Sequence, residues 1–406
     1  MAASPLITRL FGPETFGVLG TFSALVAVVS PLAAFAYPKA IVLPRNDEEA
    51  FGIAMISVFL SFTVALILAI ILWIWGDLLE DSIGIQVTGI FIFFLPLSLL
   101  FTGLYKIAQQ WLIRKRQFSS AARATVLHSF ILNFTKVGAG LFYPTAGILI
   151  GLQAIGGALY AGLLGLAIRS GKTLSGERKE EGNEDCRAGW LELAKRYYDF
   201  PLYRAPQDFI NAASQSLPVL MLASLFGPVA AGFYALGMIV MGMPSSLIGK
   251  SVNDVFFPKI NEAANQGKNL TRLILKATGG LALIGIVPFT TVVVFGPWLF
   301  KWVFGLDWGG AGEYARWLAL FFFFNFINKP CVASVPVLRL QKGLLFYEVF
   351  STASKVAGLL VGFYVYNSDL VAVALFSVIG VLAYSAMMIW IIKEAKKRGS
   401  HGQASR

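Results

Sequence analysis

Eleven long apolar runs constrain this chain more than any other feature of its sequence. A helix needs about 20 mostly apolar residues to cross about 30 Å of hydrocarbon, and only 14% of the residues are charged, against about 25% in a soluble domain. The runs are continuous rather than alternating, which argues against a transmembrane β-barrel. The composition also excludes a soluble enzyme, a disordered chain and a collagen-like or disulfide-stapled protein. We therefore expect an all-α polytopic membrane protein with about 11 complete transmembrane helices, near 15–38, 51–76, 84–105, 119–142, 146–168, 200–225, 228–252, 273–299, 311–337, 344–365 and 369–392.

The basic residues predict which way these helices run. Of the 33 Lys and Arg residues, 27 lie in one alternating set of connectors and in the C-terminal tail, and three lie in the other set. The remaining three lie inside the runs. By the positive-inside rule the richer set is cytoplasmic, and so is the C-terminus. Most of the net charge of +11 thus reports orientation, so we expect membrane lipids rather than nucleic acid as its partners.

A short motif recurs with an offset of 215 residues. Leu-Phe-Gly-Pro stands at 10–13 and again at 225–228, and Val-Leu-Pro-Arg at 42–45 is answered by Phe-Phe-Pro-Lys at 256–259. Each pair brackets one apolar run from an outer turn to an inner one, so the two copies share one orientation. The pattern predicts a parallel repeat of two six-helix bundles.

The repeat also predicts the domain boundaries. The second copy has a full run, 200–225, ahead of its motif, whereas the first has only a short stretch, so we expect that most of a first helix is missing and that 12 spans is the intended number. The polar stretch 169–198 is expected to be a cytoplasmic linker between an N-terminal bundle, 1–168, and a C-terminal bundle with a basic tail, 199–406. Within the linker, 190–197 is either an amphipathic segment at the inner interface or simply flexible.

Polar stripes at helical spacing mark four of the runs. Ionisable groups inside a membrane cost a few kcal/mol and usually face a bundle interior or a water-filled cavity. The candidates for such a lining are Arg204, Asp208, Asn211 and Gln215 in one run, Thr125, Ser129, Asn133, Lys136 and, at the margin, His128 in another, Asn325, Asn328 and Lys329 in a third, and Glu348, Ser351 and Lys355 in a fourth. Arg204 and Asp208, four residues apart, form a candidate ion pair.

The expected depth of each side chain in the membrane distinguishes these candidates. Lys329 and Lys355 each lie roughly ten residues from the inner end of a run, so about 15 Å deep, and are expected to line a central cavity. Lys136 is either a snorkelling anchor or a cavity residue. Arg204 is either a topology signal or a functional residue. His128 is more typical of an interhelical hydrogen bond than of a proton relay.

Lysines dominate the charge expected inside the spans, where Lys136, Lys329 and Lys355 stand against Asp208. A cation-lined cavity in a low-dielectric wall attracts anions such as a pyrophosphate group. A cavity rich in Asp and Glu would instead indicate cationic drugs.

Motifs for catalysis or metal binding are not found in the sequence. Gly-Lys-Thr at 171–173 resembles the end of a P-loop, but Leu166 stands where the earlier glycine is required. GxxxG spacings at 147–151 and 358–362 are interpreted as close helix packing. We therefore predict a protein that is not an enzyme and has no catalytic residues, metal or cofactor.

Segments across most of the chain resemble one transporter group. They are SPLITRLFGPETFG (4–17), LPRNDEEA (43–50), WLIRKRQF (111–118), LAKRYYDFPLYRAPQDFINAASQSLPVL (193–220), LFGPVAAGFYALG (225–237) and FGPWLFKWVFGLDWGGAGEYAR (295–316). The chain resembles the oligosaccharide flippases of O-antigen and related surface polysaccharides, within the multidrug/oligosaccharidyl-lipid/polysaccharide exporter superfamily.

This resemblance implies two six-helix lobes around a central cavity that opens alternately to the two faces of a bacterial inner membrane. It implies a polyprenyl-pyrophosphate-linked oligosaccharide as the cargo, with Lys329, Lys355 and Lys136 on the anionic headgroup. It also implies functional association with a polysaccharide polymerase and glycosyltransferases. Members of the group usually begin with the helix that this chain lacks. The alternatives are an exporter of drugs or metabolites from the same superfamily, and a membrane polysaccharide polymerase or ligase.

Overall fold

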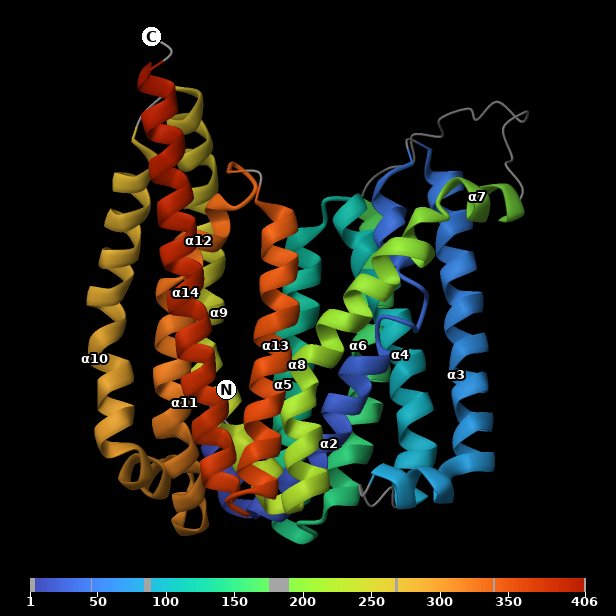
Figure 1. The fold of residues 1–406 in the computed structure, drawn as a ribbon. Helices are drawn as coiled ribbons and strands as arrows, with labels where there is room; N and C mark the ends of the chain where they lie inside the picture. The colour runs from blue at the N-terminus through green and yellow to red at the C-terminus, as the bar shows by residue number, and fades with distance from the viewer. Residues whose placement is uncertain are drawn as a thin grey trace. The chain divides into compact units, whose positions relative to one another are not determined.

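The computed structural model describes residues 4–44, 46–83, 89–174, 190–266, 269–338 and 340–404, and within these ranges every regular element is a helix (Figure 1). The chain forms two compact units, Met1–Pro228 (unit 1) and Val229–Arg406 (unit 2). The predicted all-α fold is therefore confirmed.

Unit 1 is built from pairs of long helices. Helix α3 packs on α4, α4 and α5 both pack on α6, and α8 packs against α2. One of its cores is formed by the buried side chains of Phe22, Leu72, Leu95 and Ile150. The elements are α1 (Ser4–Leu10), α2 (Pro13–Val29), η1 (Tyr37–Val42), α3 (Asp47–Ile83), α4 (Gly89–Arg114), α5 (Phe118–Phe142), α6 (Ala146–Leu174), α7 (Trp190–Arg196), η3 (Phe200–Arg204) and α8 (Ala205–Phe226).

Unit 2 repeats this arrangement. Helix α10 packs on α11, and α11 and α13 both pack on α14, with Ile260, Ile274, Cys331 and Ile391 in a buried core. The elements are α9 (Pro228–Asn265), α10 (Leu270–Phe304), η4 (Leu306–Trp308), α11 (Gly309–Ile327), α12 (Lys329–Ser334), α13 (Gln341–Tyr364) and α14 (Asp369–Ala404).

Both copies of the Leu-Phe-Gly-Pro motif are turns that lead into a helix. Pro13 is the first residue of α2 and Pro228 is the first residue of α9. Proline suits this position because the N–H groups of a first helical turn have no intrahelical partner. The same order of helices and the same helix pairs follow each motif, as the predicted parallel repeat requires.

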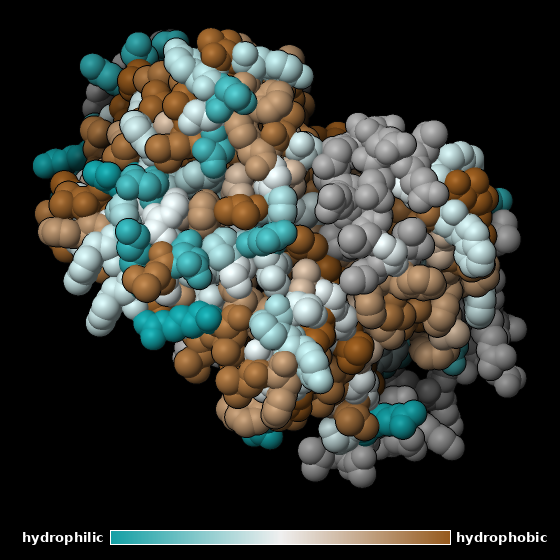
Figure 2. Space-filling view, turned by 90° about the horizontal axis from the view of Figure 1, so that it is seen from below, coloured by the Kyte–Doolittle hydropathy of each residue, from teal (hydrophilic) through white to brown (hydrophobic). Residues whose placement is uncertain are grey.

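The helices have the length and surface of membrane spans. Eight helical segments within the described ranges are long and apolar enough to cross a membrane, and the described parts of the runs at 84–105 and 119–142 are helical in α4 and α5. Phe59, Phe62, Leu66 and Trp73 of α3 are all more than half exposed, as expected of a lipid-facing helix. The face seen in Figure 2 mixes hydrophilic with hydrophobic residues. The chain is a multi-pass membrane protein.

The first predicted run is interrupted, and its predicted extent, 15–38, is wrong. Helix α2 ends at Val29, and the chain continues through turns to η1. Ser30 precedes Pro31, which has no N–H to continue a helix and disfavours helical geometry in the residue before it. Phe35 and Ala36 then adopt positive φ angles of 46° and 59°, which are strained for residues with a Cβ.

The expected linker falls largely outside the described residues, which omit 175–189. Its amphipathic end forms α7, which packs on α3 with the side chain of Leu193 buried. The expected domain boundaries and the expected loss of a first helix stay predictions.

One predicted packing motif is confirmed. A Cβ added to Gly358 would lie 2.6 Å from a side-chain atom of Ile379, and one added to Gly362 would lie 2.3 Å from the Cα of Ala372. These glycines therefore let α13 approach α14 closely.

Candidate functional site

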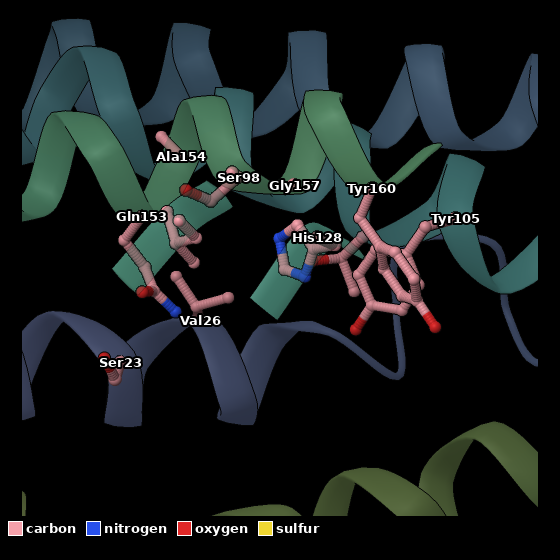
Figure 3. A pocket seen from close by; sticks show the side chains of 12 residues that line it. Ser23, Val26, Ser98, Tyr105, His128, Gln153, Ala154, Gly157 and Tyr160 are labelled. Atoms are coloured by element: carbon pink, nitrogen blue, oxygen red, sulfur yellow. The ribbon is translucent and has the colours of Figure 1, made fainter. Parts of the chain in front are cut away.

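Unit 1 contains a pocket of about 320 Å³ between four of its helices (Figure 3). The lining residues come from α2 (Ser23, Val26), α4 (Ser98, Thr102, Tyr105), α5 (His128, Leu132) and α6 (Gln153, Ala154, Gly156, Gly157, Tyr160). The structure thus brings His128, a predicted candidate, into a pocket that the sequence did not predict.

Aromatic contacts fix the imidazole of His128. Its ring stacks on Tyr160 with centroids 4.8 Å apart, and Tyr160 contacts Tyr105 at 5.2 Å. The Tyr160 hydroxyl is 2.9 Å from the Thr125 hydroxyl. Within the described part of the chain, His128 Nε2 and Ser98 Oγ are buried and have no hydrogen-bond partner. The pocket therefore holds two buried polar atoms that a ligand could satisfy.

Glycines on α6 make room for this arrangement. A Cβ on Gly156 would lie 2.9 Å from Leu132 and 3.6 Å from His128 Nε2, and a Cβ on Gly157 would lie 3.1 Å from Phe101. A larger residue at either position would push α6 away from α5 or α4.

Lys136 lies beside the pocket and is held by one of its lining residues. Its ammonium donates to Gln153 Oε1 at 2.8 Å, across from α5 to α6. The amide of Gln153 is oriented by this bond, and in Figure 3 it points towards Val26.

A second cationic cluster in unit 1 surrounds Asp208. Lys39 Nζ lies 2.5 Å from Asp208 Oδ2, and the predicted pair of Arg204 and Asp208 is confirmed at 3.5 Å. Lys106 lies within electrostatic range of Lys39 and Asp208 and donates to the Ser30 carbonyl oxygen at 3.1 Å. Two cations thus pair with one carboxylate, and a third lies nearby.

The rest of the α8 stripe continues from this cluster. Gln215 Nε2 donates to Asn211 Oδ1 at 3.1 Å. Arg204 itself ends η3, a short π-helix, and such segments are frequent at functional sites.

In unit 2 the ammonium of Lys355 lies over two aromatic rings. It is 5.8 Å from the ring centroids of both Phe321, on α11, and Phe376, on α14. Glu348 acts on Lys355 electrostatically from the same helix. Our count of the charges inside the spans did not include this carboxylate. No ion pair of Lys355 within 4 Å is found among the residues that the structure describes.

Two further predicted residues of unit 2 are Lys329, at the start of a helix, and Asn325, which bonds to a tyrosine. Lys329 begins α12, and its side chain lies against Gly249, where a Cβ would be 3.2 Å from Lys329 Cε. Asn325 Nδ2 donates to the Tyr384 hydroxyl at 2.6 Å.

Lys136 and Lys355 are equivalent positions of the repeat, which our sequence reasoning missed. Thr-Lys-Val at 135–137 and Ser-Lys-Val at 354–356 stand 219 residues apart, on α5 and α13, which pack on α6 and α14 respectively. This short match is the sequence signal that could have revealed the equivalence of the two lysines.

The partners of these two lysines are equivalent as well, but differ chemically. Gln153 and Phe376 each stand four residues before a glycine, Gly157 or Gly380, that packs against a phenylalanine of α4 or α11. An amide in unit 1 is therefore replaced by an aromatic ring in unit 2.

Lys39 and Lys106 belong to the 27 basic residues that the sequence placed in connectors and in the tail. In the structure Lys106 lies within helix α4, whereas Lys39 lies in η1, between α2 and α3. Over the described ranges, no three His, Cys, Asp or Glu residues gather as a metal site would require.

Comparisons with known proteins identify one matching family. A family model described as "polysaccharide biosynthesis protein" matches residues 6–174 and 185–313. A search of curated proteins found none that matches.

Solved structures share the fold over almost the whole chain. An inward-facing multidrug resistance MATE family transporter of the MOP superfamily has a TM-score of 0.70 at 15% identity, covering 99% of this chain and 94% of that one. A MATE protein in complex with MaD3S has a TM-score of 0.56 at 16% identity, covering 99% and 92%. A MATE protein in a bent conformation has a TM-score of 0.54 at 16% identity, covering 98% and 92%. At these identities the likeness shows the fold alone.

Proposed function

The chain belongs to the polysaccharide biosynthesis protein family, and from this premise we propose that it flips a polyprenyl-pyrophosphate-linked oligosaccharide across the membrane by alternating access. The cargo moves from the cytoplasmic to the outer face of a bacterial inner membrane, for an O-antigen-like surface polysaccharide. The C-terminus is cytoplasmic, and glycosyltransferases and a polysaccharide polymerase are functional partners. The match to transporter structures supports a carrier rather than an enzyme.

The environment of Lys355 is the observation that supports an anionic headgroup in the cargo. Its two cation–π contacts stabilise the ammonium by about 0.5–2 kcal/mol each, whereas removing a charge from water costs several kcal/mol. Glu348 acts on Lys355 only at a distance, and a pyrophosphate would supply a counter-charge in direct contact. The other proposed cargo contacts are Lys329, Lys136, Arg204, Asp208, Asn211, Gln215, Asn325 and His128.

A second candidate function, export of drugs or metabolites, is favoured by the TM-score of 0.70 with a multidrug resistance transporter. Cationic drugs would need unpaired carboxylates, and Asp208 already has two basic partners. Glu348 has no ion pair within 4 Å among the described residues and is the carboxylate that an exporter would use. The lysines of the apolar helices favour the flippase.

The test is a strain that lacks the gene, complemented with wild type or with variants. Lys355→Gln and Lys329→Gln should each reduce surface polysaccharide strongly at normal protein level, while Lys355→Arg retains it. Lys276→Gln, on an exposed residue of α10, is the matched control.

Normal polysaccharide in the strain without the gene would refute the flippase. Increased sensitivity of that strain to several unrelated drugs, with normal polysaccharide, would support the exporter. Normal polysaccharide in both lysine variants would refute the proposed roles of Lys355 and Lys329, but not the flippase itself.

A further inference from the structure

The pocket of unit 1 differs chemically from the sites around the lysines. None of its twelve lining residues is Asp, Glu, Lys or Arg, and seven carry polar side chains. We propose that this pocket binds one neutral sugar ring of the cargo, an inference that rests on the proposed function. The lysines would then hold the phosphates while the pocket recognises a sugar.

The first argument is the mixture of donors and acceptors. Gln153 Oε1 is occupied by Lys136, so the amide nitrogen of Gln153 remains to donate. Ser98 Oγ and His128 Nε2 are buried without partners within the described ranges; a hydroxyl both donates and accepts, and a neutral imidazole nitrogen does one or the other. A sugar hydroxyl can satisfy each of them, whereas an ammonium only donates and cannot pair with the Gln153 nitrogen. A phosphate could accept from these groups, but no lining residue carries a positive charge to balance it.

The second argument is rigidity. His128 is held by its stack on Tyr160, Tyr160 is held by Thr125, and Gln153 is held by Lys136. Figure 3 shows the imidazole between the Gln153 side and the two tyrosines. Polar groups fixed in advance lose less entropy on binding, which favours recognition of hydroxyl positions.

The third argument is size. At about 30 Å³ per molecule, a pocket of 320 Å³ holds about ten waters. This lies at the small end of ligand pockets, which range over about 300–1,000 Å³. The space fits a single sugar ring with its hydroxyl groups and excludes a whole oligosaccharide. The pocket would therefore recognise one sugar unit of the cargo.

The test is ligand-observed saturation-transfer NMR with the full-length protein in lipid nanodiscs. The neutral probes are the methyl glycosides of glucose, galactose, mannose and N-acetylglucosamine, and the charged probes are methylammonium and inorganic pyrophosphate. We expect saturation transfer to at least one glycoside, which neither charged probe displaces.

Variants place the binding in the pocket. Ser98→Ala, Gln153→Leu and His128→Phe should each weaken the glycoside about threefold to tenfold, the loss expected of one hydrogen bond. Ser377→Ala is the matched control for a buried serine without a partner, and Gln266→Leu is the matched control for the glutamine. Both should bind as wild type does, and a thermal unfolding scan confirms that each variant is folded.

No saturation transfer to any glycoside in the wild-type protein would overturn the proposal. So would equal binding by the wild type and all three pocket variants, or displacement by methylammonium or pyrophosphate. These failures differ from failure of the proposed function: normal polysaccharide in the strain without the gene refutes the flippase, whereas absent glycoside binding in a working flippase refutes only the sugar pocket.

Discussion

Two lysines at equivalent positions of the repeat hold their charges in different ways. Lys136 donates to an amide oxygen, and a hydrogen bond of a charged group contributes about 1.5–3 kcal/mol. Lys355 instead lies over two rings, Phe321 and Phe376, and each cation–π contact contributes about 0.5–2 kcal/mol. The two lysines are thus held about equally strongly, but the rings leave the N–H groups of Lys355 without an oxygen acceptor among the described residues, which favours phosphate binding at Lys355 and an orienting role for Lys136.

The role of Lys136 can be tested by substitution. Lys136→Met removes the donor that orients Gln153, and the loss of one charged hydrogen bond predicts transport about tenfold to a hundredfold slower. Lys136→Arg keeps a donor and should retain most of the activity. The measurement is the rate at which surface polysaccharide reappears after induction of the gene, with Lys276→Met as control. Wild-type rates in Lys136→Met would contradict the orienting role.

At the scale of helices, small residues decide how closely neighbours pack. A Cβ on Gly362 would meet the backbone of Ala372 at 2.3 Å, and backbone atoms cannot rotate away as a side chain can. Gly362→Ala should therefore destabilise the protein by about 1–3 kcal/mol, although alanine gains up to about 1 kcal/mol of helix propensity over glycine.

Gly279→Ala on α10 is the matched control, because nothing lies within 4 Å of its added Cβ. It gains the same helix propensity without a clash, so its melting temperature should stay equal or rise. Thermal unfolding of both purified variants separates the two effects. Equal melting temperatures would show that α13 and α14 adjust without cost.

Local signals in the sequence predicted the helices well, but not their interruptions. Apolar runs indicate spans because lipid selects apolar side chains, and α3, α6 and α14 follow from them. Pro31 is a local signal for the end of α2 at Val29, but it lies inside an apolar run, so hydropathy did not reveal it. The carbonyl of Ser30 then finds its partner in Lys106, 76 residues away, a contact that hydropathy does not encode.

The same distinction separates the predicted from the unpredicted parts of the site. Arg204 and Asp208 are four residues apart on neighbouring helical turns, so spacing alone predicted their ion pair. Lys39 meets Asp208 across 169 residues, and the pocket combines four helices. Both depend on tertiary packing, which the spacing of residues in a single sequence does not reveal.

At the scale of the whole chain, the charge bias and the repeat make one joint prediction. The positive-inside rule places the C-terminus in the cytoplasm. A parallel repeat places equivalent connectors on the same side of the membrane. The connectors at 143–145 and 365–368 should therefore both be outside, and those at 115–117 and 335–340 both inside.

Alkaline phosphatase inserted in these four connectors tests both statements, because the enzyme is active only outside the cytoplasm. We expect activity severalfold above background for insertions at 143–145 and 365–368, background activity at 115–117 and 335–340, and fluorescence from green fluorescent protein fused to the C-terminus. Reversed activities within both pairs would refute the orientation but keep the parallel repeat. Opposite activities within both pairs would require an inverted repeat, and then Lys136 and Lys355, though matched in sequence, would lie on helices that cross the membrane in opposite directions and would not be equivalent positions.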